Sequence, residues 1–220
     1  MSSVITVKTY NEPPFCEKEI LRYAGCKNAD NEILTLMHSC IAEVRDTLTY
    51  KVCFREFNIS VTDNICDFGV FKFRSQQLAS NLAGCKSVII FGATVGVGID
   101  RLIAKYGRIS PARALMLQAV GAERIEALCD AFCEDWQKEK GAFLKPRFSP
   151  GYGDLPLSAQ KDIFSVLDCE KRIGLFLNDS FLMSPSKSVT AFVGITDRKP
   201  EKPDKCTSCN KKDCYFRSIV

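Results

Sequence analysis

The stretch of chain with the most informative side chains covers residues 147–154, which read Arg-Phe-Ser-Pro-Gly-Tyr-Gly-Asp. Pro150 and Gly151 predict a turn whose backbone N–H and C=O groups point outward and are free to bind a ligand. Arg147 offers a planar guanidinium that suits a carboxylate. Tyr152 offers a ring face that suits a cation or an adenine. Together these groups fit a zwitterionic amino acid with a sulfonium centre, and an ordered loop without a ligand is the alternative.

Acidic side chains precede this loop, on a predicted helix or at its end. Asp130, Glu134 and Glu139 are the three that can accept hydrogen bonds from an ammonium group. We therefore expect carboxylates from the helix to bind the ammonium group of the same zwitterionic ligand whose carboxylate binds Arg147.

A second group of reactive side chains lies near the C-terminus, where Cys206, Cys209 and Cys214 have the spacing C-x2-C-x4-C. Three thiolates so close together predict a zinc site or an iron–sulfur cluster, with the fourth ligand unassigned. Neighbouring lysines favour the thiolate form. Redox-active thiols and a tail without chemistry are the alternatives. The other nine cysteines are scattered, and we expect reduced thiols that pack as small hydrophobic groups.

Two further features favour a structural role. The glycine-rich residues 92–98 lie between a predicted strand and a predicted helix. Their spacing matches neither the dinucleotide-binding fingerprint nor the P-loop, which favours a tight strand-to-helix turn. His38 is the only histidine and has no companion ligand nearby in the sequence. Because no Gly-x-Ser-x-Gly motif accompanies it, a serine hydrolase is disfavoured.

The composition is that of a globular protein with a sizeable core. The 220 residues are 46% hydrophobic and 25% charged, which favours one large domain. The 30 basic and 26 acidic residues are scattered, so nucleic-acid binding is not expected. We find neither a membrane-spanning run nor a signal-peptide pattern, and predict a cytoplasmic protein without membrane contact.

Hydrophobic periodicity and capping residues predict the elements that position these groups. Strands are expected over residues 4–10, 50–62, 68–73, 87–94, 175–177 and 188–195. Helices are expected over residues 17–24, from 30 onward, 75–83, 99–106, 110–139 with a break at Gly121, and 158–169. Because strands and helices do not alternate regularly, the fold class is α+β rather than doubly wound. Residues 1–196 form the predicted domain, and residues 197–220 form a linker and a cysteine-rich tail.

The loop and the sequence after it resemble the activation domain of cobalamin-dependent methionine synthase in a free-standing form. Arg147 to Tyr152 matches the Arg-x-x-x-Gly-Tyr loop of that family. The matching downstream segments are Arg172-Ile-Gly-Leu and Asn178-Asp-Ser-Phe-Leu-Met-Ser-Pro, followed by Ser188-Val. The resemblance is clear over about residues 122–195 and looser before them.

This resemblance implies an α+β fold built on a twisted antiparallel sheet with flanking helices. It also implies that the loop binds S-adenosylmethionine mainly through its backbone, with help from acidic residues. The S-adenosylmethionine-binding residues it implies are Arg147, Phe148, Ser149, Gly151, Tyr152, Asp130 and Glu139. Asp130 stands where the family has a glutamate. Glu139 is the candidate for a second acid, whose place by strict count is Gly141.

The implied activity is that of a methyltransferase component, which supports reductive re-methylation of an oxidised corrinoid. Because cobalt is the nucleophile, orientation carries the catalysis and no catalytic side chain is expected. The sequence lacks a cobalamin-binding Asp-x-His-x-x-Gly motif, so cobalamin is expected on a partner, either methionine synthase or another corrinoid protein. Flavodoxin or ferredoxin is the expected electron donor. The rival hypothesis is a non-catalytic metal- or cluster-binding adaptor that docks on a corrinoid protein, which the departures at Asp130 and Gly141 favour.

Overall fold

The computed structural model describes residues 4–26 and 28–199, and its centre is a five-stranded antiparallel sheet. The strand order is β1-β2-β6-β10-β7, so the apolar segment predicted as the central strand does lie at the centre. In that order the strands are β1 (Thr6–Tyr10), β2 (Tyr50–Asn58), β6 (Ser87–Thr94), β10 (Ser188–Thr196) and β7 (Phe143–Leu144).

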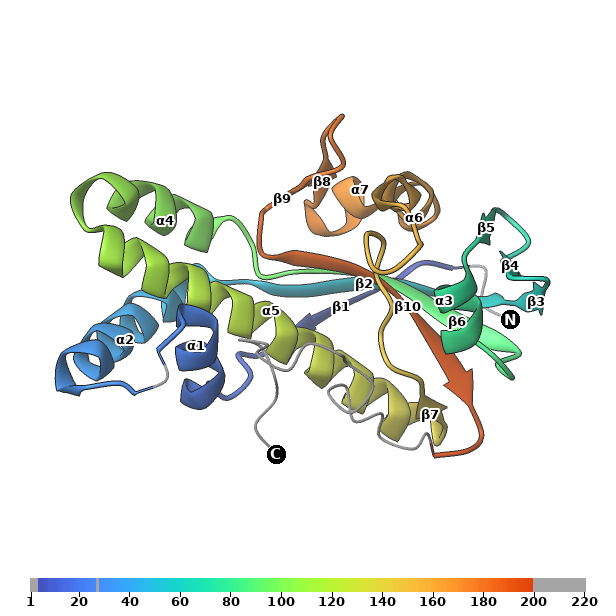
Figure 1. Ribbon diagram of the computed structural model, residues 1–220, viewed down its shortest axis with the longest axis horizontal. Helices are drawn as coiled ribbons and strands as arrows, with labels where there is room; N and C mark the ends of the chain where they lie inside the picture. The colour runs from blue at the N-terminus through green and yellow to red at the C-terminus, as the bar shows by residue number, and fades with distance from the viewer. Residues whose placement is uncertain (1–3, 27, 200–220) are drawn as a thin grey trace.

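Helices cover both faces of this sheet (Figure 1). The long helix α5 crosses one face, α1, α2 and α4 gather at one end of the molecule, and α6 and α7 pack on the opposite face. The helices are α1 (Glu17–Ala24), α2 (Asn31–Val44), α3 (Gln76–Asn81), α4 (Gly98–Ile109), α5 (Pro111–Lys140), α6 (Gln160–Leu167) and α7 (Cys169–Ile173), with 3-10 turns η1 (Arg45–Thr47) and η2 (Leu157–Ala159).

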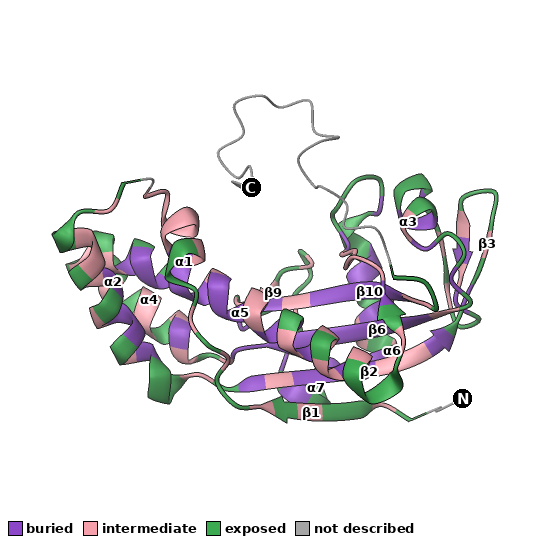
Figure 2. Ribbon diagram, turned by 90° about the horizontal axis from the view of Figure 1, so that it is seen from below, coloured by how far each residue is buried: buried purple, intermediate pink, exposed green. Residues whose placement is uncertain are grey.

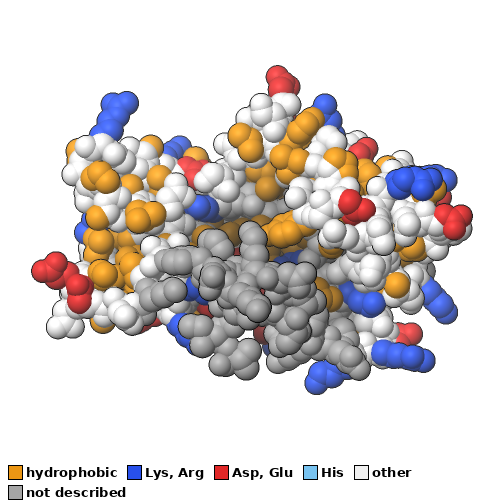
Figure 3. Space-filling model, viewed as in Figure 1, with side chains coloured by type: hydrophobic (Ala, Val, Ile, Leu, Met, Phe, Trp, Pro, Cys, Tyr) orange, Lys and Arg blue, Asp and Glu red, His pale blue; other side chains and the backbone are white. Residues whose placement is uncertain are grey.

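Two small sheets complete the fold. One contains β3 (Ser60–Thr62), β4 (Ile65–Asp67) and β5 (Lys72–Arg74), and the other contains β8 (Phe176–Leu177) and β9 (Met183–Ser184). Hydrophobic side chains reach the surface near the β8–β9 hairpin, where Phe176 is 48% and Leu182 is 61% exposed (Figure 3).

Alternating side chains of β6 build a separate core on each face of the sheet. Ile89 and Phe91 point toward α5 and its neighbours, whereas Val88 and Ile90 point toward α6 and α7. A strand buried on both faces reads as a continuous apolar run, which explains why β6 has no polar side chain from Val88 to Ala93. In Figure 2 the inner strands are accordingly mostly buried, and the outer surfaces of the helices are exposed.

The predicted break at Gly121 is wrong, because α5 continues through this residue without interruption. A Cβ atom at Gly121 would lie 2.9 Å from Cγ of Lys187 and 3.2 Å from Cδ1 of Ile99. The glycine therefore makes room for the Lys187 side chain beside the helix. Packing on both sides of α5 outweighs the cost of an interior glycine, which is about 1 kcal/mol.

Two predicted strands are wrong in their extent. The segment 50–62 is split between the central sheet and a small sheet, at Ile59, whose N–H donates to the carbonyl of Lys86 (3.1 Å). The segment 68–73 begins with a turn rather than a strand, because the N–H of Phe68 donates to the carbonyl of Phe71 (3.1 Å). Gly69 takes a φ of +80° in this turn, a conformation that glycine adopts without strain.

The helix predicted over residues 158–169 is also divided. It starts as η2, continues as α6 and ends at Asp168, whose φ of +51° interrupts the helical path before α7 begins. Periodicity did not reveal this break because Asp168 is polar and carries no glycine or proline signal. The remaining predicted helices and strands of the described residues are confirmed within a few positions.

All nine cysteines among residues 4–26 and 28–199 are free thiols, and six of them are buried, as predicted for small packing groups. Within the same residues, no helix is both long and apolar enough to cross a membrane. The predicted linker and tail lie almost entirely outside the described residues, and Cys206, Cys209 and Cys214 are all outside them.

Candidate functional site

The candidate site is built around Arg147, which follows β7 where the chain leaves the edge of the central sheet. Its guanidinium bridges two carboxylates one helical turn apart on α5. Nη1 donates to Oδ1 of Asp130 (2.5 Å) and Nη2 donates to Oε2 of Glu126 (2.7 Å). The structure thus brings together the arginine and the first of the predicted acids.

Burial and charge act in opposite directions on Arg147. Burial alone lowers the pKa of this guanidinium, but its neighbours Cys129, Asp130 and Glu126 together outweigh burial, so the pKa of Arg147 is raised. The arginine side chain is 22% exposed, whereas the side chains of Asp130 and Glu126 are 65% and 45% exposed. The site is therefore a permanent cation between two carboxylates that remain open to solvent.

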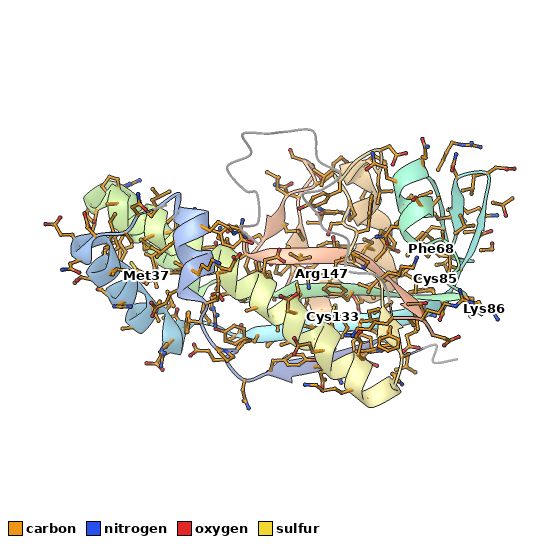
Figure 4. The ribbon with its side chains drawn as sticks, turned by 60° about the horizontal axis from the view of Figure 1, so that its bottom comes forward. Met37, Phe68, Cys85, Lys86, Cys133 and Arg147 are labelled. Atoms are coloured by element: carbon orange, nitrogen blue, oxygen red, sulfur yellow. The ribbon has the colours of Figure 1, made fainter. Side chains whose placement is uncertain are left out.

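Two thiols of α5 lie behind the guanidinium. Arg147 lies next to Cys133 (Figure 4), and Cys129 is buried one turn earlier on the same helix. Burial raises the pKa of both thiols, although Arg147 acts in the opposite direction. Because the thiolate is the nucleophilic form, neither cysteine is poised for covalent chemistry.

The loop after Arg147 is held by its own backbone. Phe148 exchanges two hydrogen bonds with Phe192 of β10, at 2.9 and 2.8 Å. Beyond it, the N–H of Gly151 donates to the carbonyl of Leu155 (2.9 Å), and the N–H of Tyr152 donates to the carbonyl of Ser149 (3.2 Å). The prediction that the turn leaves its backbone groups free is therefore wrong for these two N–H groups, because a compact turn satisfies its own donors.

The side chains of the loop divide into anchors and exposed groups. Pro150 is buried, whereas Phe148 and Ser149 are half-buried. Gly151 takes a φ of +87°, which favours glycine, and Tyr152 is 68% exposed. The tyrosine ring is thus presented to solvent from a structured turn, and its face is free to stack.

The structure does not bring the other predicted acid to this cluster. Glu139 accepts a hydrogen bond from Nζ of Lys8 (2.7 Å) instead, and Lys8 also binds Asp135 (2.8 Å). Nine residues separate Asp130 from Glu139, which is two and a half helical turns, so the two side chains lie on opposite faces of α5. Gly141 ends the helix with a φ of +65°.

Glu134 lies one turn beyond Asp130 and borders an open hollow of about 400 Å³ at the end of α5. Glu126, in contrast, was missed by sequence reasoning although it binds Arg147 directly. Its position four residues before Asp130 was the available signal, because residues at this spacing share a helix face.

The glycine-rich segment is a tightly packed turn, and His38 is a surface residue. In the glycine-rich turn, a Cβ atom at Gly96 would lie 2.4 Å from Oγ1 of Thr49, and one at Gly98 would lie 2.1 Å from the carbonyl oxygen of Thr47. His38 is exposed and pairs with Glu17 (3.1 Å). No group of three or more histidine, cysteine, aspartate or glutamate side chains is arranged for a metal within residues 4–26 and 28–199.

Comparison with solved structures identifies the class of fold. The chain is similar to the protein in "Crystal Structure of the MetH Reactivation Domain bound to AdoHcy", with a TM-score of 0.68 and 13% sequence identity. The alignment covers 90% of this chain and 80% of that one. The predicted α+β fold, a twisted antiparallel sheet with flanking helices, is confirmed.

Comparison of sequences identifies the family. The model of the family described as "Vitamin B12 dependent methionine synthase, activation domain" matches residues 78–199, which is more than half of the chain. The protein belongs to this activation-domain family, so the resemblance drawn from the Arg147 loop is confirmed. A search of curated proteins found no match.

Proposed function

We propose that this protein binds S-adenosylmethionine at the Arg147 cluster and presents its methyl group to an oxidised corrinoid. The observation that carries the proposal is the placement of a permanent cation, two open carboxylates and an exposed tyrosine ring around one loop. Membership in the activation-domain family supports the same function. The similar solved structure is bound to AdoHcy, the demethylated form of this ligand, which supports the same kind of site here.

The side chains fit the amino acid part of the ligand. Arg147 has five N–H donors and uses two of them on Asp130 and Glu126, so donors remain for a carboxylate. The same two carboxylates can accept hydrogen bonds from the ammonium group. Phe148, Ser149 and Gly151 supply the wall and backbone of the loop, and Tyr152 stacks on the adenine or faces the sulfonium. Glu139 stays in the proposal only as a residue that must both leave Lys8 and approach from the opposite face of α5 to take part.

The reaction that this site supports is a methyl transfer from the sulfonium sulfur to cobalt of a corrinoid carried by a partner. One electron from a flavodoxin or ferredoxin would reduce cobalt(II) of the corrinoid to cobalt(I). S-adenosylmethionine would then give up its methyl cation to cobalt and be released as S-adenosylhomocysteine. The protein would contribute orientation and exclusion of water rather than a general base. It would act in the cytoplasm on methionine synthase or a related corrinoid methyltransferase.

Equilibrium binding measured by calorimetry tests the first step. We expect the purified protein to bind S-adenosylmethionine and S-adenosylhomocysteine, and an absence of heat at millimolar ligand would exclude the methyl-donor function. Mixing the protein with a corrinoid-carrying methionine synthase that lacks its activation domain tests the second step. With S-adenosylmethionine and a low-potential reductant, the cobalt(II) absorption should convert to that of methylcobalamin.

One observation favours the second candidate, a non-catalytic adaptor that docks on a corrinoid protein. The acid expected near the loop is absent at Gly141, and Glu139 is bound to Lys8 on the other side of α5. An adaptor would bind the corrinoid protein but neither S-adenosylmethionine nor S-adenosylhomocysteine. The calorimetric experiment therefore separates the two functions.

We further propose that residues 197–220 form a tail in which Cys206, Cys209 and Cys214 bind zinc or an iron–sulfur cluster. An iron–sulfur cluster would deliver an electron near cobalt, whereas zinc would stabilise a local fold because it has no redox chemistry. Anaerobic purification followed by iron, sulfide and zinc analysis distinguishes the two. Truncation before Arg198 should leave S-adenosylmethionine affinity unchanged, because every proposed ligand-binding residue precedes it.

A further inference from the structure

The short helix α3 contacts the end of the loop that follows Tyr152. The carboxylate of Asp154 accepts hydrogen bonds from Oγ of Ser75 (2.5 Å) and from the backbone N–H groups of Gln76 (2.6 Å) and Gln77 (3.2 Å). Oγ of Ser75 in turn accepts from the N–H of Leu78 (3.0 Å). The first N–H groups of a helix have no partner within it, so Asp154 and Ser75 together cap α3.

The opposite end of α3 contacts the chain just before Arg147. Nδ2 of Asn81 donates to the carbonyl of Pro146 (3.2 Å), and Nζ of Lys145 donates to the carbonyl of Ala83 (3.0 Å). A helix of six residues is about 9 Å long. This one short helix therefore binds both ends of the segment 146–154.

Close packing reinforces the contact. Gly153 takes a φ of +55°, and a Cβ atom there would lie 2.1 Å from Oε1 of Gln77. At this position the loop backbone lies against the side chain of Gln77 on α3, whose amide group would have to move to admit a Cβ atom. The helix is itself fixed in the core, because Leu78 is fully buried and Ala79 is 5% exposed. Within the loop, by contrast, Tyr152 is 68% exposed.

We propose that α3 is a brace that holds the Arg147–Tyr152 loop in its binding arrangement, which makes Asp154 and Asn81 positioning residues for S-adenosylmethionine. This inference rests on the proposed function of the loop. Neither residue belongs to the proposed ligand contacts, so each acts through Arg147 and Tyr152. Apparent affinity falls with the fraction of molecules in the competent arrangement, and a loop released at one end spends less time in it.

Substitutions at the two ends of the brace test this inference in the full chain. We expect Asp154→Ala to weaken S-adenosylmethionine binding about tenfold and Asn81→Ala about threefold, because the first removes hydrogen bonds to a charged group and the second removes a neutral one. Asp154→Asn should restore most of the affinity, since asparagine also caps helices well.

The matched control is Asp30→Ala. Asp30 caps α2 by accepting from the N–H of Ile33 (2.9 Å), at a distant helix. Its loss should lower the melting temperature as a cap substitution does while leaving the affinity unchanged. Amide hydrogen exchange supplies a readout without ligand, and residues 148–155 should exchange faster in Asp154→Ala and Asn81→Ala but not in Asp30→Ala.

The outcomes separate this inference from the proposed function. If the wild-type protein binds and Asp154→Ala binds equally tightly, the brace is wrong while the function stands. A loss of affinity in Asp30→Ala as large as that in Asp154→Ala would also overturn it, because general stability would then be the cause. If the wild type does not bind, the proposed function fails, and exchange in residues 148–155 still decides whether α3 holds the loop.

Discussion

Two arginines on or beside α5 pair with carboxylates of that helix, yet their surroundings are opposite. Arg124 is fully buried beside Glu123, which is 4% exposed. Arg147 is 22% exposed and pairs with Asp130 and Glu126, which are 65% and 45% exposed. The chemical groups are the same in both clusters, so the difference in burial distinguishes the two sites.

Every partner of Arg124 belongs to the protein. Its guanidinium donates to both carboxylate oxygens of Glu123 (2.6 Å each) and to the carbonyls of Pro13 (2.5 Å) and Pro14 (2.8 Å). Glu123 also accepts from the backbone N–H of Cys16 (3.1 Å). This cluster binds the segment between β1 and α1 to α5, and it leaves no access for a ligand.

The comparison shows that one helix carries the same kind of ion pair in a buried setting, which suits structure, and in an open setting, which suits the proposed recognition of a ligand. A buried arginine with all of its partners supplied by the chain fixes that chain. An arginine whose carboxylates face solvent can exchange partners with a zwitterionic ligand. Substitutions in the first cluster should therefore change stability, and substitutions in the second should change affinity.

The largest expected effect is on stability, at the buried cluster. Arg124→Ala should lower the free energy of unfolding by about 3–5 kcal/mol, because it leaves the carboxylate of Glu123 buried without a cation. Urea denaturation followed by circular dichroism measures the change. The double variant Glu123→Gln with Arg124→Met should recover part of the loss. A single variant as stable as the wild type would show that the buried pair does not hold the N-terminal segment.

The next effect is on affinity, at the open cluster. Arg147→Ala should weaken S-adenosylmethionine binding by about 1.5–3 kcal/mol, the range for a hydrogen bond to a charged group. Arg147→Lys should restore little of it, because lysine lacks the planar fork. The exposed Arg108 of α4 is a suitable control, and Arg108→Ala should bind normally. Equal binding by wild type and Arg147→Ala in calorimetry would place the ligand site elsewhere.

A smaller effect tests how the open cluster changes when the ligand arrives. Asp130→Asn should weaken binding about threefold, because an exposed carboxylate that accepts from the ligand ammonium contributes modestly. Whether the affinity falls or rises is informative, since Asp130 also accepts a hydrogen bond from Nη1 of Arg147 in the free protein. Tighter binding by the variant would mean that Asp130 competes with the ligand carboxylate for the guanidinium.

The features that the sequence predicts correctly are those that depend on local patterns of residues. The class of fold, the central strand and the Arg147 loop follow from periodicity, turn residues and a specific motif. The pairing of Arg147 with Asp130 is a finding of the structure, because the predicted partner of the helix acids is the ammonium group of a ligand. Glu139 is a candidate because it lies shortly before Arg147 in the chain, and its position in the sequence does not show that it lies on the opposite face of α5 from Asp130. The close approach of the Lys187 side chain to α5 at Gly121 joins segments that are distant in the chain, which no local pattern could reveal.

Contacts between distant segments were the part that the sequence could not predict. The hydrogen bond between Ser75 and Asp154 spans 79 positions in the chain, and the one between Arg124 and Pro13 spans 111. The sequence does not indicate these partners. Serine and aspartate can cap any nearby helix, and an arginine is expected at the surface because buried arginines are rare. Only the three-dimensional arrangement shows that the first pair holds the loop after Tyr152 against α3 and the second holds the N-terminal segment against α5.

The smallest expected effect lies on the outer side of α5, where Lys8 of β1 binds Asp135 (2.8 Å) and Glu139 (2.7 Å). All three side chains are partly or largely exposed, so the pairs are screened by solvent and contribute little. Lys8→Ala should therefore cause a small loss of stability and leave S-adenosylmethionine affinity unchanged. A clear loss of affinity in this variant would show that the Lys8–Glu139 pair supports the ligand site after all.

The pH dependence of this small loss follows from the charges. Hydrogen bonds from Lys8 lower the pKa of Asp135 below its ordinary 3.8 and the pKa of Glu139 below its ordinary 4.5. Their contribution to stability is thus present above those ordinary values and disappears as the pH falls through the lowered pKa values. The pKa of Lys8 is raised above its ordinary 10.5 by the same bonds, so its contribution disappears as the pH rises through the raised pKa. The stability difference between wild type and Lys8→Ala should hence be greatest near neutral pH and shrink toward both extremes, as urea denaturation at several pH values would show. A difference that does not change with pH would mean that Lys8 acts through packing of its aliphatic chain rather than through its charge.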